Sequence, residues 1–351
     1  MTIKVAVVGT GYFSQFHFDA WRRLPGAKLV AVCSLEPASL VEAAARHLIP
    51  RQFAEVGQML DAVEPDLVDI VTPPSAHLAV LSAAAERGVA AICQKPLGGD
   101  LASARALVRR AEAAGIMLVA HENFRFMPWY REARRLIEAG AFGRLLNIGF
   151  RLRPGDGQGP RAYLDRQPYF QDMPRFLVHE TAIHLIDIFR YLCGEVAGVF
   201  ARLRRLNPAI RGEDAGYVVF DFASGAAGLF DGNRLSGFAA ADPRLTMGEM
   251  WLEGEVATLR LDGEGRLFLK PHQQPEREHA YAWQNQGFGG DCVYALQRHV
   301  LAHLQDGAPL ENEGRAYLRN LEVEEAIYRS ADTGRWQPLP PPTGPTQAAP
   351  W

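Results

Sequence analysis

Lys95 is the first residue whose setting suggests chemistry. It follows Val89–Cys93, an apolar run that predicts a buried strand, and Pro96 fixes the backbone directly after it. An ammonium held at the end of such a strand can stabilise an alkoxide that forms on a substrate. The alternative is a surface lysine that enters a turn, and the spacing alone leaves both interpretations open.

A second group of candidate residues lies in Phe176–Leu192, which predicts a largely buried helix because apolar residues surround its axis. Glu180, His184 and Asp187 are spaced i, i+4 and i+7, so on an α-helix they share one side. An unpartnered buried polar group costs about 2–7 kcal/mol, so we expect these side chains to face each other, water or a ligand. A carboxylate next to an imidazole is typical of a general base. The alternative is a histidine satisfied within the core.

The same segment also has some likeness to a zinc site, since His179 and Glu180 precede His184. The spacing is one residue longer than in H-E-x-x-H, and at about 100° per residue the two histidines point roughly 140° apart. We therefore expect no metal here.

The stretch Arg153–Arg175 is a long connection rich in Gly, Pro, Arg and Tyr. A long loop of this kind is usually functional, and Arg161 and Tyr163 suit a polyhydroxy ligand. The alternative is a loop used for domain packing or dimerisation.

The element that must position Lys95 begins at the N-terminus. Ile3–Val8 predicts a strand buried on both faces, and it runs into the turn G-x-G-x-x-S that ends at Ser14. The first glycine allows the tight turn, and the second lets the backbone approach a pyrophosphate at the start of the next helix. The cofactor contacts predicted for this turn are Gly9, Thr10, Gly11, Tyr12 and Phe13.

The next strand, Ala27–Cys33, should meet the adenosine ribose at its end, where Ser34 and Glu36 stand. Glu36 can reach the ribose, and Ser34 can bond either cofactor. No Arg or Lys stands here to pair with a 2′-phosphate, which favours NAD and leaves NADP open. The alternative is that Glu36-Pro37 only starts the next helix.

Later strands deliver further residues to the same carboxyl edge of the sheet, where ligands of doubly wound sheets lie. For His77 the interpretation is support of the edge plus cofactor contact, not catalysis. The cofactor contacts predicted at this edge are Thr72, Pro73, His77, Gln94, Lys95 and Asn123.

The alternation of strands and helices predicts an NAD(P)-binding Rossmann domain over residues 1–125. Past Gly143, strands joined by short turns predict an α+β substrate-binding and oligomerisation domain over 126–336, with a large open, mainly antiparallel sheet. Residues 314–331 are candidates for a last helix packed on the first domain, and 337–351 predict a Pro-rich irregular tail. The uncovered apolar face of the sheet is a candidate dimer surface.

The composition, 48% hydrophobic and 22% charged over 351 residues, indicates a globular chain of two domains. The net charge of −3, without a concentrated basic face, argues against a nucleic-acid partner. No apolar run reaches membrane-spanning length, and we expect no leader before the first strand. Four scattered cysteines favour a reducing compartment, and we expect the cytoplasm.

Several spaced motifs occur together in one order and make the chain resemble the glucose–fructose oxidoreductase/inositol dehydrogenase/MocA-like family over residues 3–336. The resemblance implies a Rossmann domain, a large open sheet that builds dimers or tetramers, and NAD(P)-linked oxidation of sugars or cyclitols. The motifs are the glycine turn, Thr72-Pro73-Pro74 with His77, Gln94-Lys95-Pro96, Asn123-x-Arg125-Phe126-x-Pro128 and Glu180-x-Ala182-x-His184.

By this resemblance Lys95 matches the family's lysine that contacts nicotinamide and the reacting hydroxyl, and Glu180 and His184 match its paired aspartate and histidine. Three departures stand out. Gln94 replaces a glutamate, Glu180 replaces an aspartate, and Ser34 stands where NAD-preferring members often carry aspartate. Residues 158–194 look most like the D-apiose dehydrogenase branch.

We therefore expect an NAD(P)-dependent dehydrogenase that acts on a small sugar. His184 removes the hydroxyl proton, Glu180 orients His184 or passes the proton on, and Lys95 stabilises the alkoxide. Two other classes stay open. One is an NAD-dependent glycoside-cleaving enzyme that oxidises its substrate transiently, and the other is a non-catalytic sugar or cofactor sensor. The residues predicted to bind substrate are Lys95, Asn123, Arg161, Tyr163, Glu180 and His184.

Overall fold

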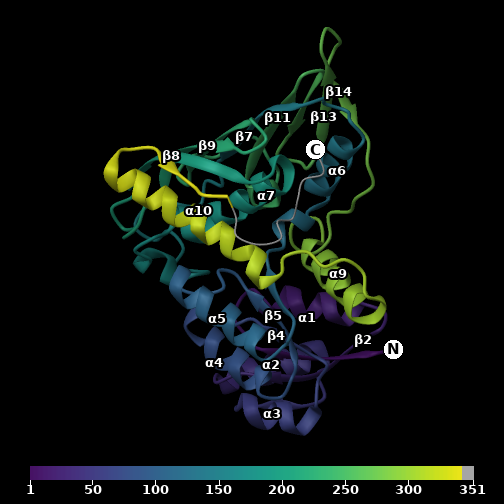
Figure 1. Ribbon diagram of the computed structural model, residues 1–351. Helices are drawn as coiled ribbons and strands as arrows, with labels where there is room; N and C mark the ends of the chain where they lie inside the picture. Colours follow the sequence, from purple (N-terminus) through teal and green to yellow (C-terminus); the bar gives the residue numbers. More distant parts are fainter. Residues whose placement is uncertain (342–351) are drawn as a thin grey trace. The chain divides into compact units, whose positions relative to one another are not determined.

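The computed structural model describes residues 1–341, which form two compact units (Figure 1). The first unit combines Met1–Asn123 with Asp291–Leu318, and the second combines Phe124–Gly290 with residues 319–341. No helix within the described range is both long and apolar enough to cross a membrane.

Within residues 1–341, the sheet of the first unit holds six parallel strands in the order β3-β2-β1-β4-β5-β6. This is the strand order of a dinucleotide-binding Rossmann fold, so the predicted fold class is confirmed. The central strands are buried on both faces because helices flank them. The strands are β1 (Ile3–Val8), β2 (Ala27–Cys33), β3 (Gln52–Phe53), β4 (Leu67–Ile70), β5 (Ala90–Gln94) and β6 (Leu118–His121).

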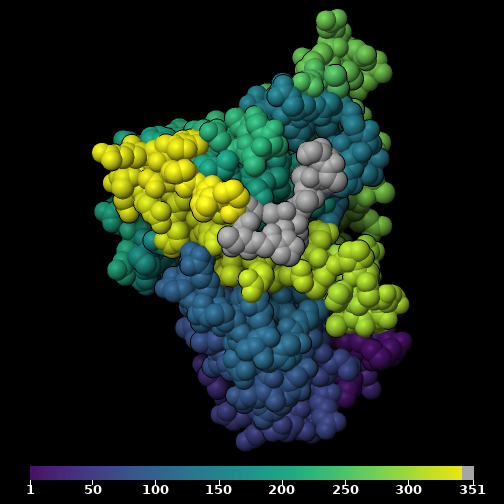
Figure 2. Space-filling model, viewed as in Figure 1, coloured from purple at the N-terminus to yellow at the C-terminus, as the bar shows by residue number. Residues whose placement is uncertain are grey.

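Helices of the first unit begin where local chemistry favours it. In α2 and α4 a proline occupies the first turn, and α5 opens with a reciprocal cap between Asp100 and Ser103. The helix α9 packs on α1, and the side chains of α4 and α5 make up part of the face of this unit that is seen in Figure 2. The helices are α1 (Ser14–Arg23), α2 (Pro37–His47), α3 (Val56–Val63), α4 (Pro74–Ala85), α5 (Leu101–Ala113) and α9 (Cys292–Asp306).

The sheet of the second unit runs β14-β13-β12-β11-β7-β10-β9-β8-β15 within the described residues. Its pairs are antiparallel except β7 with β10, so the predicted large, mainly antiparallel sheet is confirmed. The strands are β7 (Leu145–Leu152), β8 (Val196–Arg204), β9 (Ala215–Phe222), β10 (Ala227–Asn233), β11 (Gly248–Gly254), β12 (Ala257–Leu261), β13 (Leu267–Pro271), β14 (Arg277–His279) and β15 (Gln337–Pro338).

Helices cover one face of this sheet. Figure 1 shows α7 and α10 along it, and α7 packs against β7 and α6. The helix α10 (Gly314–Thr333) begins in the first unit and continues into the second. The other helical segments are η1 (Phe124–Phe126), α6 (Pro128–Glu138), η2 (Pro168–Asp172), η3 (Leu177–Ala182), α7 (Ile183–Cys193) and α8 (Pro243–Thr246).

Two segments differ from the sequence-based expectation. The single helix predicted over 176–192 is a π-helix, η3, followed by the α-helix α7. The predicted irregular tail begins with strand β15, where Gln337 pairs with Val199 of β8 and the Leu339 N–H donates to the Ala197 carbonyl. Residues 342–351, the greater part of that tail, lie outside the described residues.

Candidate active site

The glycine turn between β1 and α1 holds two glycines with different surroundings. Protein atoms crowd Gly9, whereas the space beside Gly11 is open. Gly9 has φ +111°, and a Cβ there would overlap the Val71 carbonyl oxygen. A Cβ at Gly11 would meet no protein atom within 4 Å. The Ser14 N–H and hydroxyl both donate to the Gly11 carbonyl, which starts α1. Gly9 therefore serves the fold, whereas the space beside Gly11 is available to a ligand.

A buried hydroxyl lies just after β4, the strand that pairs with β1. Within residues 1–341, the Thr72 Oγ1 atom is buried and has no hydrogen-bond partner. Buried polar atoms are normally paired, so an unpaired one calls for a partner from outside the chain. Together with the open space at Gly11, this hydroxyl fits a dinucleotide bound across the turn. Pro73, beside it, is the exposed residue that precedes α4.

Three hydroxyl groups meet where the adenosine ribose is expected. The Thr10 hydroxyl donates to Ser34 Oγ at 2.8 Å and lies 2.6 Å from Ser39 Oγ. Glu36 is exposed, and its backbone N–H donates to Ser34 Oγ at 3.3 Å. Ser39 carries no sequence motif, and it lies in this cluster because α2 follows β2 directly. The contacts of Ser34 and Glu36 with cofactor remain predictions.

His77 is completely buried between two loops of the sheet edge. Its Nδ1 lies 3.0 Å from the Leu97 carbonyl and its Nε2 lies 2.9 Å from the Thr72 carbonyl. Burial lowers the pKa of His77, although both backbone contacts act in the opposite direction. These contacts give His77 the supporting role that the sequence favoured, and cofactor contact remains a prediction.

Gln94 connects Lys95 to a buried polar cluster. The Lys95 backbone N–H donates to Gln94 Oε1 at 3.2 Å, so the Gln94 amide group faces the other way and donates to His17 Nε2 at 2.7 Å. Because His17 accepts at Nε2, its Nδ1 carries the proton and donates to Asp69 Oδ2 at 2.7 Å. His121 lies beside His17, with ring centroids 4.1 Å apart and planes tilted by 33°.

Asp69 and His17 were not predicted as site residues. One signal was present in the sequence, since an aspartate inside the apolar strand β4 must find a donor. Trp21 Nε1 also donates to Asp69 Oδ2, at 2.7 Å.

Asn123, a predicted cofactor and substrate contact, is buried and donates its amide to Cys292 Sγ at 3.0 Å.

In the second unit, the ring of His184 is stacked on Phe124. The ring centroids lie 3.7 Å apart and the planes differ by 3°. The segment η1 supplies Phe124 and the helix α7 supplies His184, and these two elements pack together. Phe124 therefore fixes the plane of the candidate base.

Asp187 does not share a site with Glu180 and His184, which corrects the prediction from helical spacing. Arg125 donates to Asp187 through Nε at 2.7 Å and Nη2 at 2.6 Å, and Asn320 adds a third bond at 2.8 Å. Burial raises the pKa of Asp187, yet the charge and hydrogen bonds of Arg125 outweigh it and hold that pKa below its usual range. The carboxylate is satisfied within the core.

Glu180 lies in η3, where i→i+5 hydrogen bonding replaces the α-helical pattern, so spacing no longer predicts which residues share a face. Glu180 Oε2 accepts from the Thr181 hydroxyl at 2.6 Å and lies 3.4 Å from Arg234 Nη1. Arg234 was not predicted, because it stands just after β10 in no motif. π-Helical turns occur often at functional sites.

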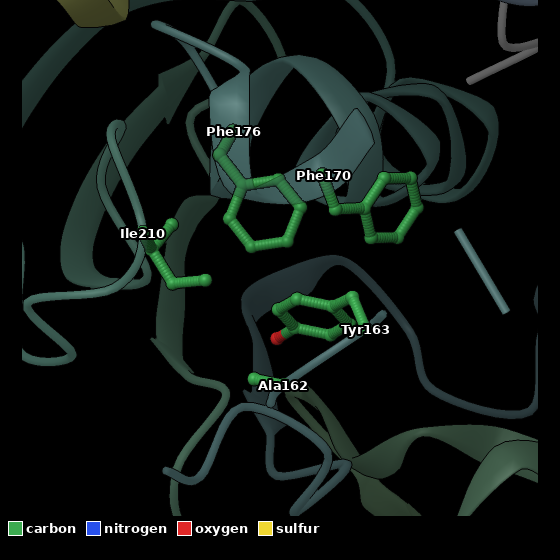
Figure 3. Packing of buried hydrophobic residues seen from close by; sticks show 5 residues of the cluster. All are labelled: Ala162, Tyr163, Phe170, Phe176 and Ile210. Carbon is green, nitrogen blue, oxygen red and sulfur yellow. The ribbon is translucent and has the colours of Figure 1, made fainter. Parts of the chain in front are cut away.

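The loop Arg153–Arg175 is folded on an aromatic cluster. Tyr163 is buried there with Phe170 and Phe176 (Figure 3), and its hydroxyl donates to Asp156 Oδ1 at 3.3 Å. Arg161 is well exposed and pairs with Asp165 at 3.1 Å. Substrate contact by Arg161 or Tyr163 remains a prediction.

Comparison with known proteins decides the family. A family model described as "Oxidoreductase family, NAD-binding Rossmann fold" matches residues 3–121, and one described as "GFO/IDH/MocA C-terminal domain" matches residues 130–257. The chain belongs to the Gfo/Idh/MocA oxidoreductase family. The predicted family and its NAD-linked oxidoreductase chemistry are thereby confirmed.

Other members of the Gfo/Idh/MocA family resemble this chain along most of its length. It is 35% identical to a D-apiose dehydrogenase of Paraburkholderia graminis, over 95% of this chain and 88% of the relative. A D-apiose dehydrogenase of Rhizobium rhizogenes is 30% identical over 95% of this chain and 96% of its own. The crystal structure of an Agrobacterium radiobacter oxidoreductase, in complex with NAD+, L-tartaric acid and magnesium, superposes with a TM-score of 0.87 at 29% identity. The match covers 96% of this chain and 98% of that one.

Proposed function

We propose that this protein oxidises a hydroxyl group of a small neutral sugar, with D-apiose as the first candidate substrate. The observation that carries the proposal is the match to two D-apiose dehydrogenases over 95% of the chain. Oxidation of the anomeric hydroxyl of an aldose gives a lactone. Relatives that act on scyllo-inositol and on levoglucosan make cyclitols and anhydrosugars the next candidates.

In this proposal His184 takes the proton of the reacting hydroxyl, with its ring plane held by Phe124. Glu180 orients the imidazole or passes the proton on. The Lys95 ammonium stabilises the negative charge that develops on the substrate oxygen. The glycine turn and the Thr72 hydroxyl would hold NAD+, which would accept the hydride. Arg161, Tyr163 and Asn123 are the further residues proposed to meet the sugar.

The experiment is a spectrophotometric screen for NADH or NADPH formation. Purified protein is incubated with D-apiose, other aldoses, inositol isomers and levoglucosan, with NAD+ and NADP+ offered separately. We expect D-apiose with NAD+ to give the highest kcat/KM. Failure of every sugar and cyclitol to reduce either cofactor, in protein that binds NADH, would refute the proposal.

We also propose that the protein forms a homodimer or homotetramer through the sheet of the second unit. Large apolar side chains stand on the face opposite α7, and the strand register places them in one row. Leu229 of β10 pairs with Val219 of β9 and with Gly149 of β7, which in turn pairs with Trp251 of β11. Val219, Leu229 and Trp251 are 38%, 46% and 36% exposed, an apolar row that a second copy could cover.

The cytoplasm is the proposed compartment. Its support is the state of the four cysteines, which are all free and buried, as is usual where thiols stay reduced.

A further inference from the structure

Arg234 is almost completely buried, at 1% exposure, among three aromatic rings. Its guanidinium carbon lies 4.8 Å from the ring centroid of Phe176, 5.1 Å from that of Tyr163 and 5.7 Å from that of Phe170. Figure 3 shows these rings grouped in one cluster. A buried charge is costly unless it is paired, so the cluster needs carboxylates at the guanidinium.

Two carboxylates from separate segments meet Arg234. Asp156, in the loop Arg153–Arg175, accepts from Nη2 at 2.8 Å and from Nε at 3.2 Å. On the other side, Nη1 donates to the Thr181 hydroxyl at 2.6 Å and lies 3.4 Å from Glu180 Oε2. Burial lowers the pKa of Arg234, but the nearby negative charges raise it by a larger amount. The net effect is a raised pKa, so the guanidinium stays charged.

The backbone ties the same loop to the same residue. The Gly157 N–H donates to the Arg234 carbonyl at 3.0 Å, and the Arg234 N–H donates to the Asp214 carbonyl at 3.0 Å. A Cβ at Gly157 would come within 2.9 Å of the Tyr163 hydroxyl and 3.1 Å of Arg234 Cβ. The loop therefore lies directly against Arg234 at both side chain and backbone.

We propose that Arg234 is a positioning residue that fixes the Glu180 carboxylate and couples it to the loop Arg153–Arg175 through Asp156. This inference rests on the proposed function, in which Glu180 orients His184. Burial, and after it the negative charge of Glu180, raises the pKa of Tyr169 in this loop. A sugar that binds the loop is thereby held at a fixed position relative to Glu180, which orients His184.

An arginine is required because one planar group must serve Asp156 and Glu180 at once. A lysine keeps the positive charge but presents a single nitrogen, which cannot span both carboxylates. Arg234→Lys is therefore the informative variant. Arg190→Lys is its matched control, since the Arg190 side chain is only 9% exposed and forms a two-point ion pair with Glu195.

The first measurement is a double-mutant cycle on kcat/KM with the sugar oxidised in the screen above. We expect Arg234→Lys to lower kcat/KM at least tenfold, mainly through kcat, with NADH affinity within twofold of wild type. In a Glu180→Gln background, Arg234→Lys should lower kcat/KM less than threefold, because its effect passes through Glu180. Arg190→Lys should lower kcat/KM by the same factor in both backgrounds. Additive losses for Arg234→Lys and Glu180→Gln would overturn the proposal.

The second measurement needs no substrate, so it separates this inference from the proposed function. Limited trypsin digestion is followed at the Arg161-Ala162 bond of the loop. Arg161 is exposed and Ala162 is buried in the aromatic cluster, so cleavage requires this part of the loop to open. Arg234→Lys and Glu180→Gln should both speed cleavage there, and Arg190→Lys should not. If cleavage is unchanged in both site variants, the loop is not held through Arg234 and the inference fails, whether or not a sugar is oxidised.

Discussion

The imidazole ring of His184 lies parallel to the phenyl ring of Phe124, at a centroid distance of 3.7 Å. Phe124 comes from the short helical segment after β6 and His184 from α7, about 60 residues further along the chain. The stack restricts the direction in which the imidazole nitrogens can point. A general base depends on that direction, so the pair links a packing contact to catalysis.

Phe124→Leu should lower kcat/KM by about two- to tenfold, because an aromatic pair contributes about 0.5–1.5 kcal/mol. The cause is lost orientation of His184, so NADH affinity should stay unchanged in a fluorescence titration. Phe126→Leu is the control, since Phe126 lies in the same segment and its ring faces Arg131 instead. Equal losses in the two variants would show that the stack has no special role.

His184→Ala should remove far more turnover than cofactor affinity, since His184 is proposed to take the substrate proton. We expect a fall in kcat of roughly 10²–10⁴-fold, the usual contribution of a general base. Lys95→Ala should weaken both turnover and NADH binding. Steady-state rates and NADH titrations check both variants, and an unchanged rate for His184→Ala would end its assignment as base.

The two glycines of the turn should respond differently to alanine. Gly9→Ala forces a Cβ onto the Val71 carbonyl at a φ of +111°, so it should lower the melting temperature strongly. Gly11→Ala meets no protein atom and should leave the melting temperature within a degree or so of wild type. Its NADH dissociation constant should rise at least tenfold, because the methyl group occupies space proposed for the pyrophosphate. Normal NADH binding by Gly11→Ala would place the cofactor elsewhere.

Asp187→Asn should destabilise the protein by about 3–5 kcal/mol near neutral pH, since it leaves Arg125 buried without its carboxylate. The folded state holds the pKa of Asp187 below the unfolded value of about 3.9. The stabilisation is therefore complete above that value and is lost as the pH falls through the folded pKa. Urea unfolding should show the gap between wild type and variant shrinking only below about pH 4.

A surface ion pair supplies the comparison for that experiment. Asp61 pairs with Arg87 as Asp187 pairs with Arg125, but the Asp61 carboxylate is exposed. Asp61→Asn should change the free energy of unfolding much less than Asp187→Asn at every pH. A pH-independent gap for Asp187→Asn would mean that its effect is steric.

Leu229→Arg should reduce the subunit count measured by light scattering, because it places a charge in the middle of the apolar row on the sheet. Leu35→Arg is the matched control, since Leu35 is 81% exposed in the first unit and should leave assembly unchanged. If Leu229→Arg keeps the mass of wild type, the sheet is not the interface.

The sequence by itself determined the elements that depend on local pattern. Buried runs and glycine turns predicted the parallel sheet, and β1 and β2 have the predicted bounds. It also determined Gly9 and Gly11, because positive φ and close backbone approach require glycine within a few residues of chain. Spaced motifs were sufficient for the family.

Only the tertiary structure decided which polar groups meet. Folding brings together pairs of polar residues that lie more than sixty residues apart in the chain. The pairs are Arg125 with Asp187, Arg234 with Asp156, and Gln94 with His17. Helical spacing failed at Glu180 because η3 is a π-helix, and no residue pattern marks that change of period. Pairing of buried charges depends on which segments pack together, and a linear pattern does not contain that information.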